Sequence, residues 1–416
     1  VVLLFYQDHY VAPLCEITNY CLLLNSMDFP FGFGQKSSLL LIFFFHGVVF
    51  SYLLLRKGFF YKNRASKWLS FLLFLCALYI APYMLGYANW YANKITREIL
   101  FFVPFMQVLL IGPVIYFYTK SLLNNQFKIS KKDWIHFIPA ILYLCYSLIV
   151  FITDKFILDE FYFYADGRDK DLANWYQIAG VISMGFYLVL SLKHYSKYKK
   201  LVYDKVSFAD SILFQWIHNF LVAFLAILIL RVLLFILNPE WGEFGSQFWH
   251  YIIFSFVVLY ISINGYANAV KMAFLSDVNS ESINVFSDAE KEDKPKQENI
   301  NQKEIEFWKQ KIIELIDKEK IYQNPKLTLT DVSKLLETNT KTVSKSINSG
   351  FEMNFNDFIN HYRIEAVKEK LKKGEHKKST FLCIAFECGF NSKATFNRAF
   401  KKSTGLSPKD YLQKLS

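Results

Sequence analysis

The 416-residue chain is too apolar to be one ordinary soluble globule, because 53% of its residues are hydrophobic, only 20% are charged and the mean hydropathy is positive. Aromatic residues make up 19% of the chain, and its formal net charge is +11. An apolar and basic chain points to a membrane, to nucleic acid or to both.

The charge divides the chain into three regions. Residues 1–275 carry 22 basic and 15 acidic side chains, residues 276–320 carry 8 and 12, and residues 321–416 carry 17 and 9. This pattern predicts a long apolar region, a short acidic segment and a compact basic module. The length of the chain allows two or three domains.

Seven apolar segments are long enough to cross a bilayer, since about 20 mostly apolar residues span its hydrocarbon core. The clearest are the first, LLLIFFFHGVVFSYLLL, and the sixth, LVAFLAILILRVLLFIL. Pro104, Gly112 and Pro113 weaken the third, although membrane helices tolerate such residues better than soluble helices do. The predicted spans lie near residues 38–55, 68–88, 100–119, 135–153, 175–192, 216–237 and 248–268.

The basic residues between these segments set the predicted orientation. The first, third and fifth connectors hold 14 Lys and Arg residues, whereas the second, fourth and sixth hold five, and the fourth is acidic. By the positive-inside rule, the N-terminus faces outside and everything after Asn268 faces the cytoplasm. The sequence therefore predicts a multi-pass protein of the cytoplasmic (inner) membrane with its C-terminal domain in the cytoplasm.

Two segments flank the predicted seven-helix transmembrane domain, which covers residues 38–270. Residues 1–37 form a predicted external N-terminal segment. Because the chain opens on Val1 and its first methionine is Met27, we expect translation to start there, with residues 1–26 as upstream sequence; the alternative is a genuine external flap. Residues 271–303 are rich in Ser, Asn, Glu and Lys and predict a flexible polar linker.

The basic C-terminal region, residues 304–416, predicts a helical domain with two helix-turn-helix units. In the first unit a short amphipathic helix ends near Leu336, Thr338 and Asn339 form the turn and N-cap, and a second helix runs from about Thr340 to Asn348. The fold class predicted for the whole chain is all-α.

The second predicted unit has a clearer turn. Apolar residues beginning at Phe381 line its first helix, Gly389 supplies the turn, Asn391 or Ser392 caps, and residues 393–403 form its second helix. A longer helix, roughly residues 355–373 and ended by Gly374, joins the two units.

The stretch CIAFECGFNSKATFNRAFKKSTGLSPKDY, residues 383–411, resembles the second helix-turn-helix of AraC/XylS-type transcription regulators. The resemblance covers about a quarter of the chain. It implies sequence-specific binding of double-stranded DNA, with the second helix of each unit in a major groove, and it also implies a homodimer and contact with RNA polymerase. The residues on the family's pattern are Ile384, Ala385, Gly389, Phe390, Phe396, Arg398, Phe400, Lys401, Gly405, Pro408 and Tyr411.

The first unit departs from this pattern in two positions. Ser333 stands where a small Ala is usual, and Glu337 occupies the place of the usual turn glycine. The first unit is therefore expected to differ from the family pattern in its turn geometry and in its share of base contacts.

The resemblance implies which side chains face DNA. Arg398 and the lysines can donate to guanine O6 and N7, Asn397 can pair with adenine, and Lys401 and Lys402 suit phosphates. Some of these lysines have a simpler interpretation as solvated helix surface. The predicted base-facing residues are Thr340, Lys341, Ser344 and Lys345 in the first unit, and Lys393, Ala394, Asn397 and Arg398 in the second.

Three polar side chains inside the apolar segments form a candidate membrane signal site: His46, Arg231 and Asn264. Arg231 is the most informative of them, since a charge at membrane depth costs at least about 2.5 kcal/mol and normally faces a partner or a cavity. The alternative for all three is a structural hydrogen bond between neighbouring helices.

The sequence as a whole predicts a membrane-anchored, one-component transcription regulator that senses a small-molecule or lipid signal in its membrane domain. No catalytic motif, metal-binding motif or cofactor motif is readable, so we expect neither an enzyme nor a cofactor. One alternative is a membrane enzyme or transporter domain that reports its substrate state to a fused regulator. Another is a simple anchor from which proteolysis within residues 276–303 releases the DNA-binding domain.

Overall fold

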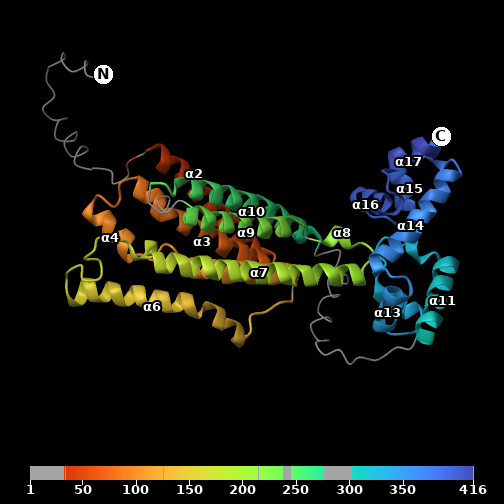
Figure 1. Ribbon diagram of the computed structural model, residues 1–416, viewed down its shortest axis with the longest axis horizontal. Helices are drawn as coiled ribbons and strands as arrows, with labels where there is room; N and C mark the ends of the chain where they lie inside the picture. Colours follow the sequence, from red (N-terminus) through yellow and green to blue (C-terminus); the bar gives the residue numbers. More distant parts are fainter. Residues whose placement is uncertain are drawn as a thin grey trace, which may run out of the picture.

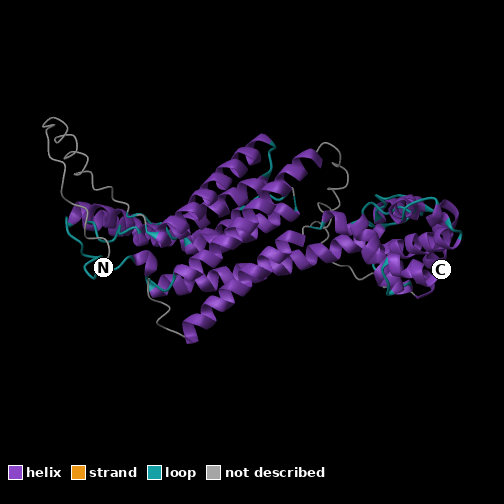
Figure 2. Ribbon diagram, turned by 90° about the horizontal axis from the view of Figure 1, so that it is seen from above, coloured by secondary structure: helices purple, strands orange, loops and turns teal. Residues whose placement is uncertain are grey.

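A computed structural model describes residues 32, 34–124, 126–213, 215–237, 245–275 and 302–415, and their regular secondary structure is helical (Figures 1 and 2). The all-α prediction is confirmed. The only strand-like pairing in these ranges is one isolated antiparallel bridge between Val206 and Thr328. The predicted start at Met27 and most of the predicted linker lie outside the described residues.

The N-terminal helices form an elongated bundle (Figure 1). Six helical segments are long and apolar enough to cross a membrane, and they coincide with six of the seven predicted spans. The helices of the bundle are α2 (Gln35–Phe60), α3 (Arg64–Tyr87), α4 (Lys94–Phe102), α5 (Val108–Leu123), η1 (Lys131–Phe137), α6 (Ile138–Ile152), η2 (Thr153–Ile157), η3 (Lys170–Leu172), α7 (Asn174–Lys205), α8 (Ala209–Ile212), α9 (Gln215–Leu237) and α10 (Phe248–Leu275).

The third predicted span, residues 100–119, is not one helix. It is divided between α4 and α5, and Pro104 lies in the break. Proline disfavours helical geometry in the residue before it, and Val103 is extended, with φ −93° and ψ 113°. At a rise of about 1.5 Å per residue, the 16 residues of α5 extend about 24 Å, which is shorter than the hydrocarbon core of a bilayer.

Helix α5 nevertheless packs closely in the bundle, because glycines let it touch α7. A Cβ atom on Gly112 would lie 2.9 Å from a ring carbon of Tyr187, and one on Gly180 would lie 2.5 Å from a methyl of Val108. Small residues at such crossings allow the backbones of membrane helices to approach closely. The glycine that weakened the sequence pattern of the third span therefore has a packing role.

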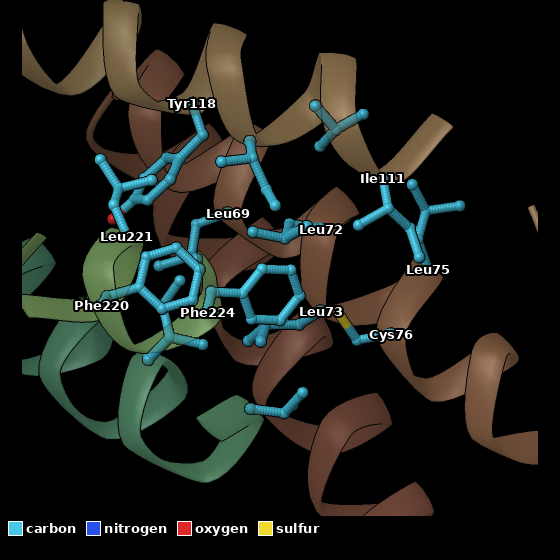
Figure 3. Close-up of a cluster of buried hydrophobic side chains, with 14 of the residues drawn as sticks. Leu69, Leu72, Leu73, Leu75, Cys76, Ile111, Tyr118, Phe220, Leu221 and Phe224 are labelled. Atoms are coloured by element: carbon cyan, nitrogen blue, oxygen red, sulfur yellow. The ribbon is translucent and has the colours of Figure 1, made fainter. Parts of the chain in front are cut away.

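The core of the bundle is built around α3, which packs against α2, α5 and α10. Leu69 and Leu72 of α3 meet Ile111 of α5 and Phe224 of α9 in one buried cluster (Figure 3). The outer faces of the bundle are apolar as well, which is the pattern of helices that are surrounded by lipid. Large exposed apolar side chains on these faces include Ile42, Phe45, Leu142, Leu148, Ile182, Phe186, Ile229 and Phe256.

Helix α7 is longer than its predicted span at 175–192. It has 32 residues, or about 48 Å of helix, so the basic segment after Leu192 continues as helix rather than as a loop. In Figure 1 its far end reaches the C-terminal helices. Similarly, α10 continues to Leu275, into the segment that the sequence assigned to the linker.

The C-terminal helices enclose two small hydrophobic cores, one for each predicted unit. The connecting helix α14 contributes to both, since Phe358 lies in the first core and Val367 in the second. The helices are α11 (Gln302–Glu319), η6 (Ile321–Gln323), α12 (Leu329–Leu335), α13 (Thr340–Gly350), α14 (Phe355–Lys372), η7 (Glu375–Lys377), α15 (Phe381–Glu387), α16 (Lys393–Thr404) and α17 (Pro408–Leu415).

Candidate nucleic-acid interface

The turn between α15 and α16 depends on a glycine. Gly389 has φ +95°, and a Cβ atom there would lie 2.3 Å from the carbonyl oxygen of Tyr322. Only glycine combines a left-handed backbone with such a close approach. Helix α16 follows directly after Ser392, whose Oγ accepts a hydrogen bond from the Thr395 amide at 3.1 Å, so Ser392 rather than Asn391 is the N-cap.

The first unit forms the same kind of turn without a glycine. Glu337 adopts a left-handed backbone with φ +51°, and the Asn339 side chain then caps α13 by accepting from the Thr342 amide at 2.8 Å. Ser333 is buried, and its hydroxyl donates to the carbonyl of Thr330 at 2.9 Å. The fold therefore accommodates both departures from the family pattern. At Glu337 this carries the free-energy cost of a left-handed backbone conformation at a residue other than glycine.

Helix α16 is amphipathic. Phe396 and Phe400 are buried in the second core, as the sequence predicts. On the opposite face Lys393, Asn397 and Arg398 are exposed, and Lys401 lies one turn beyond Asn397 on the same side. The predicted DNA-facing residues of this unit thus share one exposed helix face, while their contact with DNA stays a prediction.

The predicted face of α13 is less prominent. Lys341 is exposed, whereas Thr340, Ser344 and Lys345 are half-buried. The hydroxyl of Ser344 also lies 3.5 Å from the Asn348 amide nitrogen, which donates to it. The first unit therefore offers a smaller exposed polar surface than α16.

Two of the predicted DNA-facing cations already have acidic partners. Arg398 donates from Nη2 to the Asp210 carboxylate of α8, and its guanidinium lies 5.7 Å from the centre of the Tyr203 ring. Lys402 donates to Asp357 of α14 at 2.7 Å. Since the Asp210 contact joins residues 188 positions apart, no sequence pattern predicts it.

The contact at Arg398 belongs to a larger junction between the bundle and the C-terminal helices. Arg363 of α14 is 1% exposed and donates to the Ser207 carbonyl at 3.2 Å and to the Ser207 hydroxyl at 3.0 Å. Asn356 donates to the Val206 carbonyl at 3.2 Å, and the Ser207 amide donates to Leu327 at 3.1 Å. The segment after α7 is therefore docked on the C-terminal helices.

The predicted membrane signal residues do not come together as one hydrogen-bonded group. Arg231 donates to the Tyr79 hydroxyl at 2.5 Å and to Gln177 Oε1 at 3.3 Å, beside a cavity of about 20 Å³ that His250 also lines. His46 instead lies 2.6 Å from the Ser262 hydroxyl, and Asn264 donates to the Tyr260 carbonyl at 2.9 Å. Tyr79, Gln177 and His250 are thus the neighbours of Arg231 that sequence reasoning missed.

Sequence reasoning also missed two buried carboxylates in the acidic connector before α7. Asp171 accepts hydrogen bonds from the Tyr143 hydroxyl at 2.5 Å and the Met106 amide at 2.8 Å, and Asp169 accepts from the Tyr91 hydroxyl at 2.7 Å. Burial, together with the charge of Asp169, raises the pKa of Asp171 to about 7. These carboxylates hold the connector onto the bundle.

Comparison with known proteins bears on the C-terminal part only. Residues 332–414 match the sequence profile of the helix-turn-helix domain family. No characterised protein and no solved structure is detectably similar to the chain. Within the described ranges, no group of three or more His, Cys, Asp and Glu residues is placed to hold a metal ion. With its two capped helix pairs and the connecting α14, this region of the chain is an AraC-type helix-turn-helix domain.

Proposed function

We propose that this protein is a membrane-anchored, one-component transcription regulator that binds specific DNA sequences through its C-terminal helices. The match of residues 332–414 to a helix-turn-helix family carries the proposal, because such domains regulate transcription by binding DNA. The exposed cationic face of α16 supports it, since arginine and lysine donate to guanine in the major groove. From the resemblance alone, we extend the proposal to a homodimer that contacts RNA polymerase.

Membrane anchoring is supported by six long apolar helical segments and by the apolar outer surface of the bundle. The excess of basic residues in the first, third and fifth connectors favours a cytoplasmic position for the C-terminal helices. A DNA-binding domain requires the same placement, so the two arguments agree.

The proposal includes regulation by a signal that acts through the bundle. In the docked arrangement Arg398 is held by Asp210, and a guanidinium in this ion pair is not positioned to read a base. A docked state and a DNA-bound state would then exchange, and a signal that favours one of them changes DNA affinity. The direct hydrogen bonds between Ser207 and Arg363 give the bundle a physical connection to the DNA-binding helices.

The test is selection of binding sites from a random pool of double-stranded DNA by the full-length protein in lipid nanodiscs. We expect enrichment of a defined sequence. Arg398→Ala should weaken binding to that sequence by about 1–3 kcal/mol and relax the preference at one base pair. Failure of the wild-type protein to enrich any sequence would refute the proposal.

Lys401→Ala supplies the matched control on the same face of α16. Because a phosphate contact carries no sequence information, this variant should weaken binding to all sequences alike. It should also make the slope of log affinity against log salt concentration about one unit less steep. A blot for the tagged protein in membrane and soluble fractions tests the anchor. A soluble C-terminal fragment that binds the same DNA would favour release by proteolysis instead.

A further inference from the structure

A cavity of about 940 Å³ lies at the junction between the bundle and the C-terminal helices. Its walls come from the end of α7, the start of α9, the end of α13 with the segment after it, and Arg398 of α16. Binding sites for small molecules are typically about 300–1,000 Å³ in volume, so this junction cavity is large enough for a compact organic ligand.

The junction cavity carries more cationic than anionic side chains. Lys199 and Lys200 of α7 and Arg398 of α16 line it, together with two acidic residues, Asp204 and Glu352. Neither lysine forms an ion pair or a hydrogen bond with another described residue, although Lys200 is electrostatically close to Asp204. Lys199 therefore has no acidic partner among the described residues, whereas Lys200 shares the cavity wall with Asp204 without a salt bridge to it.

The remaining lining groups suit a polar ligand that contains a planar group. Tyr203 offers a half-buried aromatic ring, while His218 and Asn219 of α9 add exposed nitrogen groups. The cavity also lies at the end of α7 where its basic residues concentrate. Basic side chains at the cytoplasmic end of a membrane helix attract anionic headgroups.

We propose that the junction cavity is a binding site for a phosphate-bearing ligand, held by Lys199 and Lys200 of α7 and by Arg398 of α16. The ligand is either the headgroup of an anionic lipid or a soluble phosphate compound from the cytoplasm. Both sources present the same charged oxygens to the same three side chains.

Arg398 links the junction cavity to DNA binding. A ligand that contacts Arg398 stabilises the docked position of α16, whereas DNA that contacts Arg398 removes one cation from the cavity wall. Each therefore weakens the binding of the other by the same factor, because coupling between two sites is reciprocal. This coupling rests on the proposed function, while ligand binding itself does not.

The experiment uses two probes with the full-length protein in nanodiscs of phosphatidylcholine. Native mass spectrometry measures retention of added phosphatidylglycerol, and equilibrium dialysis at constant ionic strength measures binding of radiolabelled inorganic pyrophosphate. The test variant is Lys199→Ala/Lys200→Ala. We expect about 30-fold weaker binding of whichever probe the wild type retains, since each basic residue near an anionic surface contributes about a fivefold effect.

Lys193→Ala/Lys197→Ala is the matched control. It removes two exposed lysines from the same helix, but neither residue lines the junction cavity. This control should bind the probes as the wild type does, and Lys199→Arg/Lys200→Arg should retain binding because both charges are kept. Retention of phosphatidylglycerol alone identifies a lipid, and binding of pyrophosphate alone identifies a soluble ligand; either result supports the site.

The proposal is overturned if the wild type binds neither probe, or if the two alanine pairs lose binding equally, because a general basic surface would explain the latter. A separate measurement tests the coupling: the bound probe should weaken binding of the selected DNA in the wild type and leave Lys199→Ala/Lys200→Ala unaffected. Absence of sequence-specific DNA binding would refute the proposed function, but the measurement of probe binding would still test the proposed ligand site.

Discussion

Replacing Asp210 with Asn removes the charge that holds Arg398 at the junction and keeps the size of the side chain. The Tyr203 hydroxyl, which donates to Asp210 at 2.9 Å, retains an oxygen acceptor in the variant. The main change is therefore the loss of one ion pair across the junction. Because Arg398 is a predicted base-contacting residue, we expect Asp210→Asn to bind DNA more tightly than the wild type.

The expected size follows from the exposure of the two partners. The Arg398 side chain is 46% exposed and that of Asp210 is 9% exposed, so solvent screens the pair on one side. Exposed ion pairs contribute about 0.2–1 kcal/mol, and we take the upper end because Asp210 is almost enclosed. If the docked state predominates, about 1 kcal/mol raises DNA affinity about fivefold.

The assay is fluorescence anisotropy of labelled DNA with the full-length protein in phosphatidylcholine nanodiscs. Salt must be held constant, since phosphate contacts make DNA affinity steeply salt-dependent. Asp204→Asn is the control, because it removes the same charge from the end of α7 without touching Arg398. Unchanged or weaker binding by Asp210→Asn, or an equal gain in Asp204→Asn, would show that the ion pair does not restrain α16.

Three further changes test the fold and the buried groups. Arg363→Ala should lower the stability of the C-terminal helices by about 3 kcal/mol, because it leaves the buried Ser207 carbonyl and the part-buried carbonyls of Tyr322 and Asn324 without their donor. Faster hydrogen exchange in α14 would show this loss, and unchanged exchange would contradict it. Gly389→Ala should abolish DNA binding by unfolding the second unit. Gly405→Ala should cost only about 1 kcal/mol of stability, because Gly405 has φ +74° but no atom of the described residues lies within 4 Å of an added Cβ. Equal losses of thermal stability in the two variants would refute the steric argument. The folded protein keeps the Asp171 proton at pH values where an unfolded chain has lost it, so stability should fall as pH rises from about 4 to about 7. The wild type should therefore have a higher melting temperature at pH 5 than at pH 8. Asp171→Asn should reduce that difference.

The features that the sequence by itself determined are local ones. A hydrocarbon core sets a minimum length of apolar helix, so six of the predicted spans follow from composition alone. The second helix-turn-helix unit is similarly local, because Gly389 fixes the turn and Phe396 and Phe400 repeat at helical spacing. Such patterns involve residues within a few turns of one another, and a linear sequence displays them directly.

Local patterns were less reliable where packing decides the outcome. The sequence predicted one helix through residues 100–119, but the helix is interrupted around Pro104. Helix α5 is instead positioned by the close contact of Gly112 with α7. The sequence also treated the basic residues after Leu192, which lie within α7, as a connector. In the structure that segment remains helical and reaches the C-terminal helices, a continuation that no hydropathy pattern reveals.

Only the tertiary structure decided the partners of the polar side chains. Arg231 could be recognised as a buried charge, yet its contacts with Tyr79 and Gln177 come from helices far apart in the sequence. The pairing of Arg398 with Asp210 and the burial of Asp171 likewise depend on how separate segments pack. A charged group in a low-dielectric interior takes whichever partner the fold brings within hydrogen-bonding distance, and that distance is a property of the packed chain rather than of any stretch of its sequence.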